Sequence, residues 1–244
     1  MIRFRPLAGF TLLCLALFAM LVGLGAWQLQ RLQWKRALIA QMSRNMTAPP
    51  IGLDGALALG SDRAQYRRVV IDGRFENSKE AYVFTTGANG APVYHVLTPV
   101  LLDDGRMMMV DRGYVPPPLR EPASRPGSQP RGQQHVTGFW LTPDRPGLFT
   151  PRPDLLHRIW FARDLSGIEH VDQVRLAAPA ILEAAATSNG RTWPRGGQMR
   201  VDLPNDHLQY ALTWFLLAGA LVFVYFTYHR ARGRLGRATE NPLP

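Results

Sequence analysis

Two long apolar runs without a charged residue, one near each end of the chain, constrain its fold more than any other feature. The first run covers Leu7–Trp27 and the second covers Leu208–Tyr228. Each has the roughly 20 residues that an α-helix needs to cross the hydrocarbon core of a bilayer. The residues between the runs suffice for one sizeable domain. The sequence therefore predicts two transmembrane helices on either side of a single domain.

Arginines in the short terminal tails predict the orientation of the chain. Two precede the first run and four follow the second: Arg3, Arg5, Arg230, Arg232, Arg234 and Arg237. Basic residues in short tails stay on the cytoplasmic side of a membrane, so we expect both termini in the cytoplasm. No Arg- and Ser-rich amphipathic targeting segment precedes the first run, which favours a bacterial plasma (inner) membrane with the domain in the periplasm. The predicted limits are 1–6 for a cytoplasmic tail, 7–29 for the first transmembrane helix, 30–206 for the periplasmic domain with a juxtamembrane helix, 207–228 for the second transmembrane helix and 229–244 for a basic cytoplasmic tail.

A cleaved signal peptide is the alternative interpretation of the first run. Gly23-Leu24-Gly25 offers the small residues of a cleavage site. However, the apolar run is longer than the core of an ordinary signal peptide, and the helical pattern continues through Trp27–Arg31. We therefore expect the first run to be retained as a membrane anchor.

Charge and cysteine content exclude several classes of function. The formal net charge is +10, and six of the arginines lie in the tails. The remaining excess suits anionic membrane lipid or an acidic partner, so we expect no nucleic-acid partner. The one cysteine, Cys14, lies within the first apolar run. A disulfide, a Cys-x-x-Cys redox pair, covalent haem attachment and copper delivery by paired thiolates are therefore excluded.

The central domain is predicted to be rich in β-strands. The stretches with β-branched and aromatic enrichment are Tyr66–Phe75, Ala81–Thr86, Val93–Leu102, Arg106–Val115, Gln134–Leu141 and Arg158–Arg163. Asp103-Asp104-Gly105 is typical of a hairpin turn. We expect a short helix within Arg163–Val174 and interpret Ala178–Ala186 as a strand, although its alanines favour helix. The predicted fold class is an α+β membrane protein, with two transmembrane helices bracketing one antiparallel, barrel-like or sandwich-like extracytoplasmic domain.

The sequence contains no recognisable arrangement of catalytic residues. It has no Gly-x-Ser-x-Gly elbow, His-Glu-x-x-His pair or phosphate-binding glycine-rich loop with lysine. His135, His157 and His170 lack the spacing of metal ligands, and His95 is expected to pack in a strand with a hydrogen bond. Met107-Met108-Met109 cannot converge on copper, because neighbours in a strand point to opposite faces. We therefore predict that the chain is not an enzyme.

His207 stands at the mouth of the second apolar run, where an imidazole could bind a metal. Trp214 follows seven residues later, nearly two helical turns away on the same side, and Tyr210 lies between them. Such a stripe could hold a flat aromatic ligand. The alternative is an ordinary interfacial stripe, because Trp and Tyr gather at the headgroup level of membranes.

The first helix is predicted to continue out of the membrane and to carry matching groups. Trp27 and Arg31 share one of its faces, and Gln28 lies on the neighbouring stripe. An aromatic belt with basic anchors is again the alternative. Because a single domain connects the two runs, we expect their outer ends to be adjacent and Arg31 to lie near His207. Such a cleft suits a haem, with His207 on the iron, Trp214 against the ring and Arg31 at a propionate.

A set of spaced motifs runs through nearly the whole chain. The motifs are Gly25–Arg31 with Trp34-Lys35, Gly73-Arg74-Phe75, Tyr94–Pro99, Asp104-Gly105-Arg106, Asp111–Pro116, Trp160–Leu165 and Asn205–Phe215. In this order they resemble the surfeit locus (Surf-one/Shy-one) family of cytochrome c oxidase assembly factors. Tyr114 stands where the family usually has Trp, and Asp206 stands where Asn is common. Neither departure touches the proposed ligand.

The resemblance implies a membrane-anchored chaperone of respiratory-chain biogenesis. Some bacterial relatives bind haem a and present it to oxidase subunit I, and the histidine and tryptophan implicated there fall on His207 and Trp214. In one hypothesis the chain takes haem a transiently from haem a synthase and passes it to subunit I. In the other it is a pigment-free scaffold that stabilises a subunit I assembly intermediate. An electron carrier is disfavoured, because no second axial ligand is evident.

Overall fold

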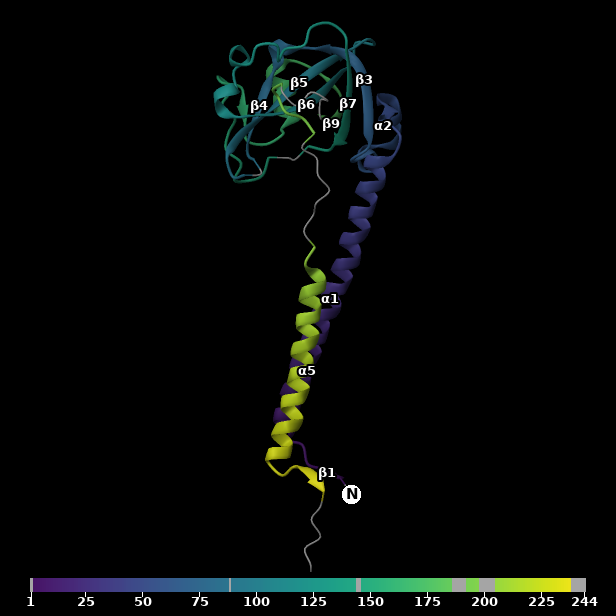
Figure 1. Cartoon of the computed structure of the whole chain (residues 1–244), viewed down its shortest axis with the longest axis vertical. Coiled ribbons are helices and arrows are strands. Elements are labelled where there is room, and N and C mark those ends of the chain that lie inside the picture. Colours follow the sequence, from purple (N-terminus) through teal and green to yellow (C-terminus); the bar gives the residue numbers. More distant parts are fainter. Residues whose placement is uncertain (1, 88, 144–145, 186–191, 198–204, 238–244) are drawn as a thin grey trace, which may run out of the picture. The chain divides into compact units, whose positions relative to one another are not determined.

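The computed structural model describes residues 2–87, 89–143, 146–185, 192–197 and 205–237. The chain forms two compact units (Figure 1). The first, called the helix pair below, comprises residues 1–40 and 202–244, and the second, called the β domain, comprises residues 41–201. The predicted architecture of two apolar helices that bracket one β-rich domain is confirmed.

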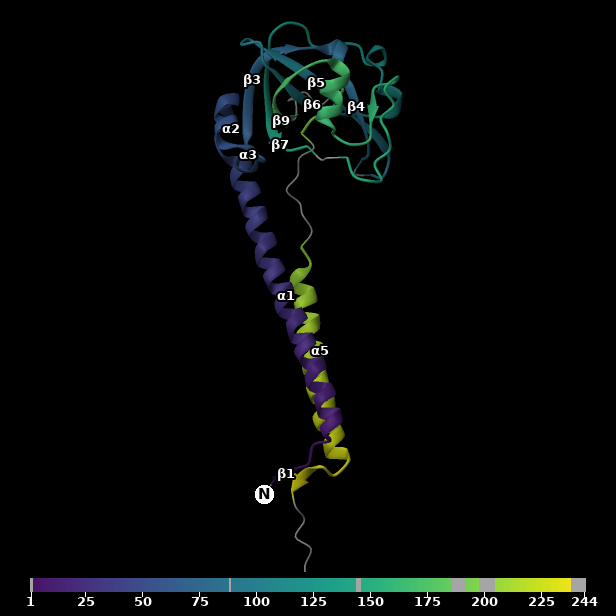
Figure 2. The same ribbon diagram turned by 180° about the vertical axis from the view of Figure 1, so that it is seen from behind.

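The helix pair is built from α1 (Ala8–Thr47) and α5 (His207–Ala231), which lie side by side in Figures 1 and 2. Both helices are long and apolar enough to cross a membrane. Large apolar side chains such as Leu12 and Phe223 are 68% and 69% exposed, which suits contact with lipid. α1 has 40 residues, about twice the length that a bilayer needs, so its helical pattern continues beyond the predicted span. The membrane limits at 7–29 and 207–228 stay predictions.

Small residues form the seam between α1 and α5. Ala211 and Ala218 are almost fully buried. A Cβ atom added at Gly25 would lie 2.7 Å from the ring of Phe215. Small side chains let helix backbones approach closely, and this is a common basis of helix association in membranes. Gly25 therefore leaves the space that the Phe215 ring occupies.

A buried histidine joins the two helices at their other end. His229 is fully buried, its Nδ1 donates to the carbonyl of Tyr225 over 2.9 Å, and its Nε2 accepts from the backbone N–H of Leu7 over 3.4 Å. The rings of Phe4 and Phe10 pack against the imidazole. Beyond it the short strands β1 (Ile2–Phe4) and β10 (Leu235–Arg237) pair in antiparallel fashion. This ribbon was not expected from the sequence.

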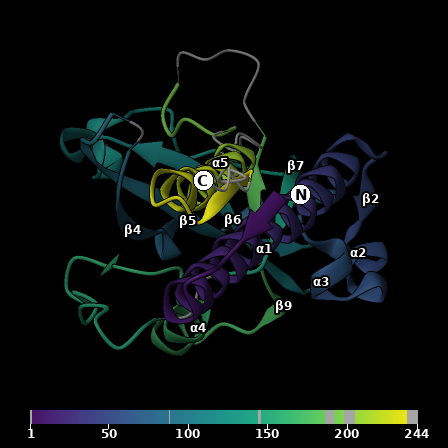
Figure 3. The same ribbon diagram turned by 90° about the horizontal axis from the view of Figure 1, so that it is seen from below.

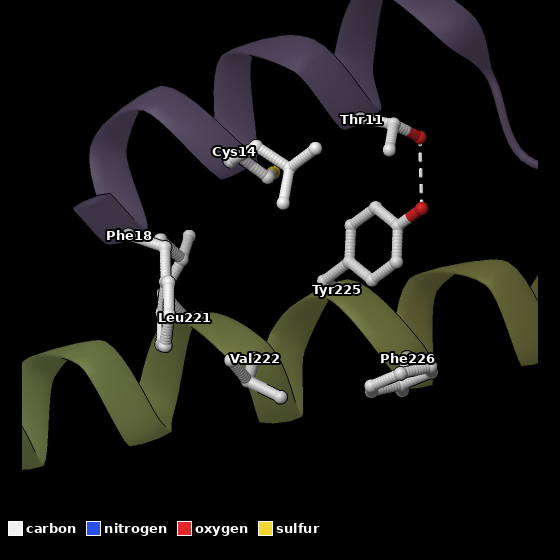
Figure 4. Close-up of a pocket in the computed structure, with 8 residues that line it drawn as sticks. Thr11, Cys14, Phe18, Leu221, Val222, Tyr225 and Phe226 are labelled. Carbon is white, nitrogen blue, oxygen red and sulfur yellow. Dashed lines mark hydrogen bonds between the residues drawn. The ribbon is translucent and has the colours of Figure 1, made fainter.

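An apolar groove of about 290 Å³ lies between the helices near this end (Figure 4). Cys14 and Phe18 line it from α1, and Leu221 and Tyr225 line it from α5. The hydroxyl groups of Thr11 and Tyr225 lie 2.8 Å apart and satisfy each other. Apart from the thiol of Cys14, the residues that line this groove include no charged or metal-binding group. The lining therefore indicates no catalytic or metal-binding role for the groove.

The β domain is built on one eight-stranded sheet. Its strands are β2 (Ile51–Gly52), β3 (Arg68–Phe75), β4 (Ala81–Thr86), β5 (Pro92–Leu102), β6 (Met107–Val115), β7 (Gln134–Leu141), β8 (Ile159–Trp160) and β9 (Leu176–Ala184). Its α-helices are α2 (Leu53–Leu59), α3 (Ser61–Ala64) and α4 (Leu165–Asp172), and short 3-10 turns cover Asn77–Lys79, Pro117–Leu119 and Pro122–Ser124. Figure 3 shows α2 and α3 beside one end of the sheet and β4 at the other.

The sheet closes on itself as a barrel. The strand order is β2-β3-β7-β9-β6-β5-β4-β8, and an additional pairing of β3 with β5 makes a closed ring of β3, β7, β9, β6 and β5. The predicted strands and the predicted hairpin between β5 and β6 are confirmed, with Gly105 at φ +83° in its turn. The antiparallel prediction needs refinement, because three pairs run parallel: β2 with β3, β4 with β8, and β6 with β9. A parallel pair requires a crossover connection, and α4 and two other strands lie between β6 and β9 along the chain.

Alternating side chains give the barrel two apolar faces. Met108 packs in a core cluster with Val100, Trp140 and residues of α2, whereas its neighbour Met109 packs with Trp160 and α4. Both methionines are fully buried. The prediction that Met107-Met108-Met109 cannot converge on a metal is therefore confirmed, and these side chains serve packing.

One buried carboxylate ties the outer loops to the sheet. Glu80 accepts hydrogen bonds from Arg112 over 3.0 Å and from Arg125, and the Tyr82 hydroxyl donates to it over 3.0 Å. Burial, followed by the negative charge of Glu80, raises the pKa of Tyr82. Burial lowers the pKa of Arg112 to about 10. The Pro-rich segment that contains Arg125 is thereby fixed on the barrel rather than forming a loose loop.

We predict that Gly25→Ala weakens the helix pair. The added Cβ would overlap the Phe215 ring, and overpacking of this kind costs roughly 1–3 kcal/mol. Gly23→Ala is the matched control, because nothing lies within 4 Å of a Cβ at that position of the same helix. Thermal unfolding of the two variants in detergent should show a lower Tm for Gly25→Ala alone. Equal Tm values would contradict a seam that depends on Gly25.

Candidate functional site

A hydrogen bond joins the two helices of the helix pair at the residue where α5 begins. The Nδ1 atom of His207 lies 2.8 Å from Oε1 of Gln28, and the histidine is partly buried. An amide oxygen can only accept, so Nδ1 carries the proton and donates it. In the neutral imidazole, Nε2 then keeps its lone pair. The predicted adjacency of the outer helix ends is confirmed at this contact.

Gln28 therefore has a more definite role than the sequence indicated. The sequence placed it on a stripe beside Trp27 and Arg31 as a possible binding residue. In the structure its amide oxygen fixes which nitrogen of His207 is protonated. Hydrogen-bond partners of this kind orient histidines that bind metals and select their tautomer. The signal in the sequence was a polar residue within an otherwise apolar helical pattern.

Aromatic residues flank Gln28 and His207 along the sequences of both helices. Trp27 and Trp34 are each 53% exposed on α1, and Tyr210 is 56% exposed on α5. Trp214 is half-buried and follows His207 by seven residues, so the two share one side of α5. The helix pair thus carries exposed or half-exposed aromatic rings within about two helical turns of Gln28 and His207.

The predicted proximity of Arg31 to His207 stays a prediction. The contact that the structure shows for Arg31 is with its own helix, where its guanidinium carbon lies 4.4 Å from the ring centroid of Trp34. Stacking on an aromatic ring holds a cation in place without neutralising its charge. Arg31 therefore remains available to an anionic group.

The number of metal-binding side chains around His207 indicates which kind of metal centre they could hold. Among the residues that the structure describes, no group of three His, Cys, Asp or Glu side chains could hold a metal ion. A bare divalent ion needs several protein donors. A haem brings four nitrogen donors of its own and needs one imidazole from the protein. The described residues around His207 thus offer one imidazole to a metal centre, and one imidazole from the protein is what a haem requires.

A second histidine cluster lies in the β domain. His95 on β5 shares a 2.8 Å hydrogen bond between its Nδ1 and Oδ2 of Asp111 on β6. The buried Asp111 also accepts from the backbone N–H of Gly113 over 2.9 Å and from Arg163 over 3.0 Å. The expectation that His95 packs with a hydrogen bond is confirmed. The role of Asp111 was missed, although the predicted hairpin pairs it with Leu97, two residues from His95.

The charges in this cluster shift the two neighbouring carboxyl groups in opposite directions. Burial alone would raise the pKa of Asp111, but the hydrogen bond from His95 and the charges of His95 and Arg163 leave it below its ordinary value. Burial, followed by the charge of Asp111, raises the pKa of Glu183 on β9. Asp111 therefore loses its proton at a lower pH than Glu183 does.

The other histidines of the β domain have simpler surroundings. His135 and His157 each share an exposed hydrogen bond with one aspartate, Asp72 and Asp154 respectively. His170 is exposed on α4. Their interpretation as ordinary surface residues agrees with these contacts.

Comparisons with known proteins agree with the motifs. Residues 15–219 match the model of the SURF1 family. The chain is 34% identical to the surfeit locus protein 1 of Takifugu rubripes over 223 residues, which is 84% of this chain and 90% of that protein. It is 32% identical to surfeit locus protein 1 of Mus musculus, over 84% of this chain and 70% of the relative. It is 29% identical to a SURF1-like protein of Rickettsia felis, over 90% of this chain and 96% of the relative.

We predict that Asp111 makes the fold sensitive to acid. Its folded-state pKa lies below the ordinary value of 3.8, so its contribution to stability is complete above that pH and is lost as the pH falls through the folded pKa. Asp111→Asn should lower the Tm at pH 7 and flatten the fall in Tm as the pH is lowered below about 4, the reference pKa of an aspartate.

The matched control is Asp72→Asn, because Asp72 also bonds a histidine but is exposed to solvent. Its Tm should follow that of the unaltered chain at every pH. An Asp111→Asn variant with an unchanged acid dependence would show that Asp111 is not held ionised by the cluster.

Proposed function

The chain belongs to the SURF1 family of oxidase assembly factors, and from this we propose that it binds haem a at His207 and presents it to subunit I of cytochrome c oxidase. In this proposal it is anchored in the inner membrane of a bacterium, with both termini in the cytoplasm and the β domain in the periplasm. Haem a arrives from haem a synthase and stays bound transiently. The proposed role is that of a chaperone and involves no catalytic step.

The hydrogen bond between Gln28 and His207 is the observation that supports haem binding most directly. It assigns the proton to Nδ1 of His207 and leaves the Nε2 lone pair for an axial bond to iron. Haem a, when bound, supplies an iron that accepts such an imidazole ligand. Without the bond to Gln28 the imidazole could rotate and change tautomer, and its affinity for iron would fall.

In this proposal neighbouring side chains would supply the other contacts to the haem. Trp214 on α5 and Trp27 on α1 would flank the ring, and Tyr210 would extend the contact on α5. Arg31 is our proposed partner for a propionate, since among the described residues its guanidinium stacks on Trp34 and pairs with no acidic group. His207 would be the single protein ligand of the iron, and a single ligand suits transfer to a recipient.

A pigment-free scaffold for a subunit I intermediate is the second candidate function. It is favoured by a loop of the β domain in which Leu148, Phe149 and Leu156 are 99%, 97% and 86% exposed. Exposed apolar side chains that lie close together often mark a protein contact. The two functions differ in whether haem a is bound, so one measurement separates them.

The test is the absorption spectrum of the full chain purified in detergent from cells that make haem a. His207→Ala should lose the haem a band, and Gln28→Leu should weaken haem binding roughly 10–100-fold, as is usual when the partner of a metal-binding histidine is removed. His170→Ala is the matched control, because this histidine is exposed on α4 and should leave the band unchanged.

Co-purification of subunit I decides the outcome. A haem a band that depends on His207, in variants that keep subunit I, supports the carrier. A colourless chain that still retains subunit I would contradict the carrier and leave the scaffold. A band that survives His207→Ala unchanged would place the haem elsewhere.

A further inference from the structure

The β domain exposes most of its large apolar side chains in one short stretch of sequence. Among its described residues six such side chains are exposed, and four of them lie within residues 148–156: Leu148, Phe149, Leu155 and Leu156. Scattered single apolar residues are ordinary on a protein surface, whereas a group of them marks a contact with another protein or with a membrane. The proposed haem site uses none of these four residues.

The first two of these side chains are held at the tip of a tight turn. The backbone N–H of Thr150 donates to the carbonyl of Gly147 over 3.1 Å, and the backbone N–H of Gly147 donates to Oγ1 of Thr150 over 2.8 Å. Leu148 and Phe149 are the two central residues of this turn and are almost completely exposed. The turn therefore presents both side chains to the surroundings.

The other two side chains stand on a second closed turn. Asp154 and Ile159 exchange backbone hydrogen bonds of 2.8 and 2.9 Å. The carboxylate of Asp154 also accepts from the backbone N–H of His157 over 3.1 Å and from its Nδ1 over 2.7 Å. Leu155 and Leu156 lie within this turn. Because both turns are closed by their own hydrogen bonds, binding requires little further ordering of the chain.

The charges beside the two turns, Gly147–Thr150 and Asp154–Ile159, leave a basic residue in excess. Three carboxylates near the second turn each have a basic partner: Asp154 with His157, Glu121 with Arg120, and Asp172 with Arg158. Arg152 lies between the turns and is exposed, and no ion pair joins it to an acidic group in the described part of the chain. A positive charge next to exposed apolar side chains suits a surface of anionic lipid.

The covalent structure favours a membrane over a protein as the occupant of these turns. The β domain, residues 41–201, is joined at both ends to the helix pair, whose two helices are long and apolar enough to cross a membrane. Such a tether keeps the domain at a high effective concentration near the bilayer, so even a weak contact is populated.

The residue types favour a membrane as well. Leucine and phenylalanine are typical of segments that enter the boundary between lipid headgroups and acyl chains. The residues that contribute most to protein interfaces are mainly Trp, Tyr and Arg, and leucine is under-represented among them. A protein partner, which is the occupant that the scaffold function would give this loop, is therefore the less favoured alternative.

We propose that the two turns insert into the surface of the membrane that anchors the chain, with Leu148, Phe149 and Leu156 at the acyl boundary and Arg152 at anionic headgroups. This contact fixes one face of the β domain against the bilayer. The inference goes beyond the proposed function and requires neither His207 nor a haem.

The test measures the depth of a nitroxide spin label by electron paramagnetic resonance. The full chain with Cys14→Ala and Phe149→Cys is labelled and placed in nanodiscs of phosphatidylcholine and phosphatidylglycerol. The relative accessibility of the label to oxygen and to a water-soluble nickel complex should place it about 5–10 Å into the headgroup and acyl boundary. The matched control is Asp104→Cys, at the exposed turn between β5 and β6, where the label should remain in water.

Further variants separate the contact from any affinity of the label itself. When Leu148→Asp and Leu156→Asp are added, the label at position 149 should leave the bilayer and become as accessible to nickel as the control. Both leucines are exposed, so the fold should be kept, and an unchanged Tm checks this. Arg152→Gln should make the label shallower in nanodiscs that contain phosphatidylglycerol and should have no effect in phosphatidylcholine alone.

Three outcomes would overturn the proposal. The label at position 149 could be as accessible to nickel as the control, it could stay at depth after both leucines are replaced by aspartate, or it could become buried only when subunit I is added. The last outcome would assign the turns to a protein partner. None of these outcomes would change a haem a band that depends on His207, and loss of that band would not change the depth of the label. The failure of this proposal and the failure of the proposed function are therefore distinguishable.

Discussion

Close packing of α1 against α5 is the constraint on which the arrangement of the helix pair depends. In a bilayer the backbone groups of each helix bond within that helix, so two helices associate mainly through the fit of their side chains. Ala211, Ala218 and Gly25 provide that fit by being small. The same contact brings Gln28 within 2.8 Å of His207, although 179 positions separate them in the sequence. The geometry of the candidate site is thus a consequence of helix packing.

The two histidine sites follow one physical rule in different settings. In each, an oxygen that can only accept a hydrogen bond fixes the proton on Nδ1. A neutral amide serves His207 in the helix pair, and a buried carboxylate serves His95 in the β domain. A carboxylate strengthens the hydrogen bond and raises the electron density of the imidazole more than an amide does. His207 is therefore the less strongly polarised of the two imidazoles.

Much of the fold could be predicted from the sequence because the deciding patterns are local. The charge-free runs, the β-branched stretches and the Asp-Gly turn each have one favoured structure, and all of them were confirmed as helices, strands and a hairpin. The parallel pairing of β6 with β9 and the ribbon of β1 with β10 depend on contacts between distant segments, which no local pattern encodes. For the same reason the sequence identified His207 and Trp214 as candidates but did not pair Gln28 with His207, or Asp111 with His95. A residue type shows what a side chain can do, and the fold decides which partner it meets.

The protonation of His207 is the most direct test of this account. Nitrogen NMR of the histidine-labelled full chain in detergent, at a pH where imidazole is neutral, distinguishes the two tautomers, and His207→Ala identifies the signal. The account predicts that the proton is on Nδ1, that Nε2 is unprotonated, and that Gln28→Leu turns this single state into a mixture of tautomers. A proton found on Nε2, or a His207 signal indifferent to Gln28→Leu, would contradict the claim that helix packing prepares this histidine to bind iron.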